Sequence, residues 1–138
     1  MLLVLILPYE RKKTMTYYDI YLTALSLIGE AENTSSTADY QKRAERLFVH
    51  INAGLYSLHL CLGGDEIDSG KFFIETLDTL FLLDERLVLT AALELASLLI
   101  IDKLPSISEM LKARAEAEKK NVADMATSIS STREVYGV

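Results

Sequence analysis

The stretch LFLLDERLVLTAALELASLLIID, residues Leu80–Asp102, decides the fold that we expect for this chain. Within residues 87–101 only Thr90, Glu94 and Ser97 interrupt an apolar run. A helix that is apolar nearly all the way round is covered by neighbours on most of its sides. The run also falls short of the ~20 largely uncharged residues that cross a bilayer core. We therefore predict a central core helix and no membrane span.

The start of this helix is marked by Asp84. Its carboxylate can accept hydrogen bonds from the unpaired backbone N–H groups of a first helical turn. Glu85 adds a second negative charge where the helix dipole favours one. The central helix is therefore predicted over Asp84–Asp102.

Composition limits the possible classes of protein. A chain of 138 residues with 50% apolar content fits one domain with its own core. Fourteen basic residues against 20 acidic ones give a net charge of −6, which disfavours non-specific binding to nucleic acid. The single cysteine, Cys61, excludes an intramolecular disulfide framework.

Residues 1–14, MLLVLILPYERKKT, differ from the rest of the chain. Their apolar run is too short for a membrane span, and their basic residues follow the apolar part, whereas in a secretory signal they precede it. Thr16 with Asp19 has the form of a capping box. We therefore expect residues 1–14 to be a non-native or disordered leader and Met15 to be the natural start.

The remaining pattern predicts an all-α bundle of about four helices around the central one. A first helix is expected over residues 16–30. A second begins after Ser36 or Thr37, presents a stripe with steps of three or four residues to the core, and ends at Gly63 and Gly64. Asn52 and His59 are assigned to its wetter sides.

Two further segments complete the prediction. Residues 65–83 form a long loop with apolar anchors, in which a short strand over Lys71–Thr76 stays open. A polar helix starts at Pro105 or Ser106 and runs to about Thr127. The helical domain therefore spans residues 15–127, and residues 128–138 form a mobile C-terminal tail.

The sequence contains no recognisable catalytic or cofactor-binding motif. His50 and His59 stand nine positions apart on one predicted helix, so they point to roughly opposite sides and cannot share a metal there. The acidic run Asp65–Asp68 lacks the ligand spacing of a calcium loop. Phosphate-binding glycine loops and serine elbows are absent from the sequence. We expect neither an enzyme nor a bound metal or cofactor.

Glu94 is the remaining residue of interest. A lone carboxylate on an apolar helix must be paired, point outward or have a raised pKa. We interpret it as an exposed residue or as a candidate for a subunit interface.

The segments MTYYDIYLTALSLIGE, FIETLDTLFLLDERLVLTAALELASLLIID and the terminal REVYGV occur here in an order that resembles the small head–tail connector proteins of tailed bacteriophages and prophages. The resemblance covers residues 15–138. The chain departs from the family pattern at Glu94-Leu95, where a tyrosine-glycine pair is common.

This resemblance implies an all-α subunit that assembles into a ring under the portal protein and meets the neck proteins on the tail side. Many such connectors are monomers in solution before they assemble. DNA would pass through the ring without specific binding. The expected location is the virion neck, with assembly in the host bacterial cytoplasm. The tail residues expected to dock on the portal are Arg133, Glu134, Val135, Tyr136 and Gly137.

Two other classes of protein fit the same composition. A small helical regulatory or interaction protein of a mobile element would bind a soluble partner in place of a portal. A small enzyme would need a concave polar site, for example one that combines Glu94 with His50 or His59.

Overall fold

The structure is a computed structural model that describes residues 15–29 and 38–136, except for the side chains of residue 38 and of residues 129–136. The described residues contain four α-helices, two 3₁₀ helices and no strand, which confirms the all-α prediction. In chain order these elements are α2 (Tyr17–Leu27), α3 (Ala38–Cys61), η1 (Ser69–Phe72), η2 (Glu85–Leu87), α4 (Val88–Ile100) and α5 (Pro105–Tyr136).

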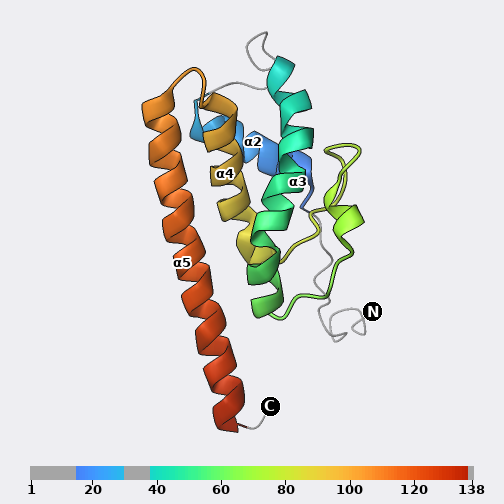
Figure 1. The fold of residues 1–138 in the computed structure, drawn as a ribbon, viewed down its shortest axis with the longest axis vertical. Coiled ribbons are helices and arrows are strands. Elements are labelled where there is room, and N and C mark those ends of the chain that lie inside the picture. Colours follow the sequence, from blue (N-terminus) through green and yellow to red (C-terminus); the bar gives the residue numbers. More distant parts are fainter. Residues whose placement is uncertain (1–14, 30–37, 137–138) are drawn as a thin grey trace, which may run out of the picture.

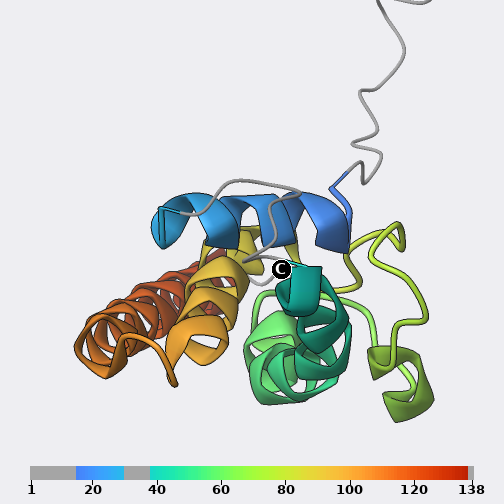
Figure 2. The same cartoon turned by 90° about the horizontal axis from the view of Figure 1, so that it is seen from above.

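Helix α4 is the centre of the bundle, as the apolar run predicts. It lies between α3 and α5 (Figure 1), and α2 crosses over α3 and α4 on a third side (Figure 2). Residues along α4 from Thr90 to Ile100 are mostly buried. An open stripe remains where Glu94 and Leu98 are half-buried and Ile101, just past the helix, is 50% exposed. The central helix is therefore covered on three sides.

The start of α2 is held by its own residues and by a distant loop. Thr16 and Asp19 form the predicted capping box. The N–H groups of Tyr17 and Tyr18 donate to the carbonyls of Thr79 and Leu77, at 3.0 and 2.8 Å. Since the first N–H groups of a helix have no partner within it, the loop completes this end of α2.

The long loop before η2 is anchored, as predicted. Its buried side chains are Phe72, Ile74, Leu77, Phe81 and Leu83. The possible strand over Lys71–Thr76 does not form, because η1 occupies its first part and the carbonyl of Phe72 bonds to a side chain of α3. A single bridge between Thr16 and Leu80 is the β-type pairing found in the described residues.

Helix α5 begins at Pro105, as predicted, but its predicted end at Thr127 is wrong. The helix continues to Tyr136. The sequence from residue 128 to residue 136 contains no glycine or proline that would stop a helix. Its apolar stripe packs inward through Leu111, Ala115, Val122 and Ala126. The mobility of residues 128–138 stays a prediction.

Candidate functional site

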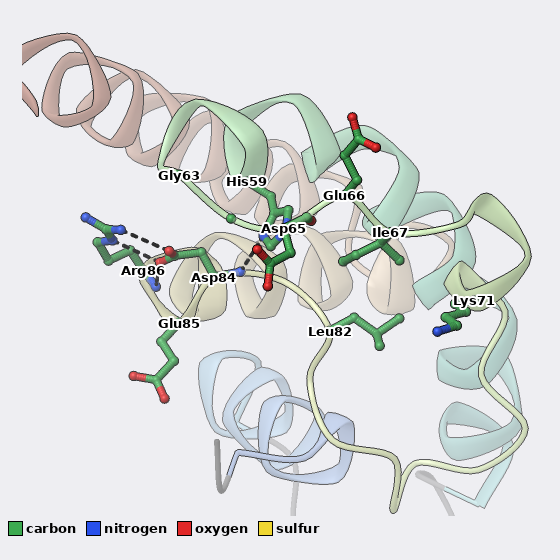
Figure 3. A pocket seen from close by; sticks show the side chains of 11 residues that line it. His59, Gly63, Asp65, Glu66, Ile67, Lys71, Leu82, Asp84, Glu85 and Arg86 are labelled. Carbon is green, nitrogen blue, oxygen red and sulfur yellow. Dashed lines mark hydrogen bonds and ion pairs between the residues drawn. The ribbon is translucent and has the colours of Figure 1, made fainter. Parts of the chain in front are cut away.

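A hollow of about 630 Å³ in the described surface lies where the C-terminal end of α3 meets the loop and η2 (Figure 3). His59, Leu82 and Arg86 line it, together with acidic residues and Lys71. This hollow is a candidate catalytic or ligand-binding site, because it combines a histidine with several carboxylates. Among the described side chains, however, no group of three His, Cys, Asp or Glu residues could hold a metal ion.

His59 is buried, with 3% exposure, so its assignment to a wet side of the helix is wrong. Its Nδ1 accepts a hydrogen bond from the backbone N–H of Asp84 at 2.9 Å. Its Nε2 lies 2.7 Å from the carbonyl oxygen of Asp65. Since Nδ1 must carry a lone pair, the proton lies on Nε2, which donates to that carbonyl.

This geometry makes His59 a bridge between two parts of the backbone. Both ring nitrogens are engaged by main-chain groups, so neither is available to a substrate in the adjoining cavity. The ring also stacks on Tyr56, with the two ring centroids 6.0 Å apart. We infer that His59 fixes the turn after α3 to the start of η2.

The two glycines after α3 have different roles around this bridge. Gly63 takes a φ of +89°, and the N–H groups of Gly63 and Gly64 close the helix end on the carbonyls of Leu60 and His59. At Gly64 the reason is space, because an added Cβ would lie 2.3 Å from Cε1 of His59. The missing side chain of Gly64 therefore leaves the space that the imidazole ring of His59 occupies.

Asp84 and Arg86 form an ion pair that lines the same hollow. The Asp84 carboxylate accepts from the backbone N–H of Arg86 and, through both oxygens, from its guanidinium, each at 2.9 Å. The hydrogen bond from the Arg86 side chain holds the pKa of Asp84 below its ordinary value, against the opposing effect of burial. Asp84 caps η2 directly, and α4 follows from that 3₁₀ turn.

A second set of buried hydrogen bonds connects α2, α3 and the loop. The hydroxyl of Tyr17 donates to Oδ1 of Asn52 at 2.8 Å, and Nδ2 of Asn52 donates to the carbonyl of Phe72 at 3.0 Å. Asn52 is 0% exposed, so its assignment to a wet side is also wrong. Burial raises the pKa of Tyr17 to about 12, although its hydrogen bonds with Leu82 and Asn52 act in the opposite direction.

The second hollow is a groove of about 380 Å³ along the open stripe of α4, where it meets α5. We call it the α4–α5 groove; Glu94, Leu98, Ile101, Pro105 and Lys112 are among its lining residues. At its floor, Ser97 and Ser108 each donate a hydroxyl hydrogen bond to the other's carbonyl, at 2.9 and 2.8 Å. Two small buried side chains thus join the helices closely.

Glu94, the candidate interface residue, lies in this groove and is paired within the chain. Its carboxylate forms an ion pair with Nζ of Lys119, which also lies 3.3 Å from the Glu116 carboxylate. Burial lowers the pKa of Lys119, but the two carboxylates outweigh it and the net shift is upward. The structure does not bring Glu94 together with His50 or His59, which belong to α3. Its role in a subunit interface stays a prediction.

Arg43 joins α3 to the other end of α4. Its guanidinium donates to the carbonyls of Leu98 and Leu99, both at 3.2 Å. These carbonyls belong to the last turn of α4, where a positive charge is favourable. Sequence patterning could not predict this contact, because the partner carbonyls belong to a helix more than 50 positions away in the sequence.

The predicted portal-docking residues lie at the C-terminal limit of the described residues. The backbone of Arg133, Glu134, Val135 and Tyr136 belongs to α5. Their side chains and Gly137 lie outside the described residues.

Comparisons of the chain with protein-family models, with curated proteins and with solved structures find no match. No helix in the described part of the chain combines the length and apolar character needed to cross a bilayer.

Proposed function

We propose that this chain is a head–tail connector subunit of a tailed bacteriophage or prophage. In this role copies of the chain form a ring under the portal protein and extend the channel through which DNA passes. The chain acts through its surfaces and not through catalysis. The proposal rests on the order of its sequence segments and on the shape of its last helix.

The observation that carries the proposal is the length of α5. This helix has 32 residues against 13 in α4, its antiparallel neighbour. Figure 1 shows its C-terminal end beyond the ends of α3 and α4. A helix that leaves its own bundle gives a partner an accessible arm, and the tail residues from Arg133 to Gly137 lie at its end.

The charge of the chain supports the same role. A net charge of −6 per subunit gives a ring an acidic surface. Such a surface repels the phosphates of DNA, so that DNA slides through the channel without adhering to its wall.

The test combines the full chain with a purified portal ring encoded beside it. Electron microscopy is expected to show added density on one end of the portal. Truncation after Ser128 is expected to keep the helical circular dichroism spectrum, since the buried residues Val122 and Ala126 are retained, and to abolish attachment. Thr127→Ala, an exposed change beside the cut, serves as the control. Undiminished attachment of the truncated chain, or no attachment of the full chain, contradicts the proposal.

A further inference from the structure

The start of the helical domain lies beside the hollow at the end of α3. The carbonyl of Met15 accepts a hydrogen bond from the N–H of Phe81 at 2.8 Å, and Thr16 forms an antiparallel bridge with Leu80. In an antiparallel pair one chain runs back along the other, so the residues before Met15 are led past Leu82. Leu82 lines the hollow (Figure 3). The described backbone therefore directs the preceding segment to this hollow.

The lining of the hollow is acidic. Four carboxylates and two basic side chains line it, a net charge of −2 with the histidine neutral. Two of these charges belong to the ion pair at the start of η2. The other acidic residues, all exposed, are Asp65, Glu66 and Glu85, against Lys71 as the other cation. Like charges held close together repel, so a basic group that enters the hollow lowers their electrostatic energy.

The segment before Met15 lies outside the described residues, and its sequence carries the opposite charge. Residues 10–13 read ERKK, one acidic and three basic residues, a net charge of +2. Arg11 stands four positions before Met15, a reach of about 13 Å at ~3.3 Å per residue of extended chain. The bond of Met15 to the loop therefore keeps three cations within reach of the hollow, at a high effective concentration.

We propose that residues 11–13 of the same chain dock in this hollow. Their basic side chains lie against the carboxylates of Asp65, Glu66 and Glu85 and neutralise the lining. The docked segment extends the backbone pairing of the first described residues, so the contact combines main-chain bonding with opposite charges. The segment thus becomes part of the domain, in place of the disordered leader expected from the sequence.

The covalent connection favours this occupant over a basic peptide of another protein. A separate peptide loses its translational freedom on binding, whereas a tethered segment has already lost most of it. Exposed ion pairs are individually weak, and salt screens them. The contact is therefore expected to form at low salt and to open in ~1 M salt. The inference does not depend on the connector role, because it concerns one copy of the chain.

Paramagnetic broadening of amide signals in NMR spectra locates the segment. A nitroxide is attached to Tyr9→Cys in the full chain with Cys61→Ser, which removes its exposed cysteine. It is expected to broaden the signals of residues 65–67 and 84–86 and to leave those of residues 39–42, at the far end of α3, unchanged. Salt at ~1 M should reduce the broadening at least about twofold. A mixture of isotope-labelled chain without nitroxide and unlabelled nitroxide chain detects contact between copies.

Exchange of charges tests the chemistry of the contact. One variant reverses the three basic residues of the segment: Arg11→Glu, Lys12→Glu and Lys13→Glu. It is expected to reduce the broadening about threefold, and Glu66→Lys with Glu85→Lys in the hollow should do the same. Both sets together should restore the broadening, because opposite charges face each other again. Asp102→Lys with Glu109→Lys, two exposed residues at the other end of α4 and α5, serves as the control and should change nothing.

The outcomes decide between three arrangements. Loss of the broadening on either reversal, and its return when both are combined, supports docking of the segment in the hollow of its own chain. Broadening that neither salt nor charge reversal alters reports only the tether at Met15 and overturns the proposal. Broadening in the mixed sample shows that the segment of a second copy occupies the hollow, which also overturns it. The substituted residues of the hollow are exposed, so the helical circular dichroism spectrum should be kept throughout.

Discussion

The imidazole Nδ1 of His59 accepts a hydrogen bond from the backbone N–H of Asp84, at 2.9 Å and across 25 positions of sequence. This bond joins the end of α3 to the start of the segment that becomes α4. With the second bond to Asp65, it closes the long loop at both of its ends.

His59→Ala is expected to lower the free energy of unfolding by about 2–4 kcal/mol. It leaves a backbone N–H and a carbonyl without their partner and opens a cavity. His59→Gln should cost less, because its amide can still donate to Asp65. Urea unfolding followed by circular dichroism measures both changes. His50→Gln on the exposed side of α3 is the control, with an expected change within about 0.5 kcal/mol. Equal effects at the two histidines would contradict the bridging role.

Gly64→Ala and Gly54→Ala make the same chemical change, but we expect them to shift the free energy of unfolding in opposite directions. At Gly54, inside α3, an added Cβ meets nothing within 4 Å, so alanine should stabilise the protein by about 0.5–1 kcal/mol. At Gly64 the Cβ collides with the His59 ring, and we expect a loss of about 1–3 kcal/mol. Thermal unfolding of both variants checks the signs. In a His59→Ala background the cost at Gly64 should largely disappear, and an unchanged cost would exclude the ring as its cause.

Stability should fall at alkaline pH because of Tyr17. Its pKa is about 12 in the folded protein against 10.0 for the free side chain. A raised pKa stabilises the protein below pH 10, and this contribution is lost as the pH rises through 12. The expected loss is about 2–3 kcal/mol over this range. Tyr17→Phe should cost about 1–3 kcal/mol at neutral pH, because Asn52 loses its donor, and should flatten the alkaline decline. Urea unfolding at several pH values measures both, and an equally steep decline in the variant would count against this assignment.

The ion pair between Glu94 and Lys119 should contribute modestly to stability. A double-mutant cycle with Glu94→Gln and Lys119→Gln is expected to give a coupling energy of about 0.5–1 kcal/mol that weakens in ~1 M salt. The pair of Lys119 with Glu116, whose side chain is 61% exposed, provides the comparison and should couple less. A coupling of zero for both pairs would mean that the ion pairs contribute nothing and that the serine contact and the buried apolar side chains hold α4 against α5.

Local signals in the sequence predict where several elements begin and end. The capping box at Thr16 and Asp19, the glycine with positive φ at position 63 and the proline at position 105 each act within a few residues of chain. Their effect can therefore be derived without a tertiary structure. The buried central helix follows in the same way from its apolar composition.

The polar contacts of the interior could not be predicted in this way. Asn52 and His59 look like surface residues because their types are usually exposed, and their partners lie in a loop without sustained periodicity. The Gly63-Gly64 pair is the available signal: one glycine suffices to end a helix, and the second suggests that a neighbouring group needs space. The pairing of Glu94 with Lys119 depends on the register of α4 against α5, which the serine contact sets.

The backbone bonds between the start of α2 and the loop also bear on the order of folding. Helices α4 and α5 are consecutive and antiparallel, so their contacts form between residues close in sequence and can form early. The first N–H groups of α2 instead need the carbonyls of Leu77 and Thr79, which lie about 60 positions away in the sequence. When the whole chain refolds, α2 is therefore expected to gain protection from hydrogen exchange after the α4–α5 hairpin.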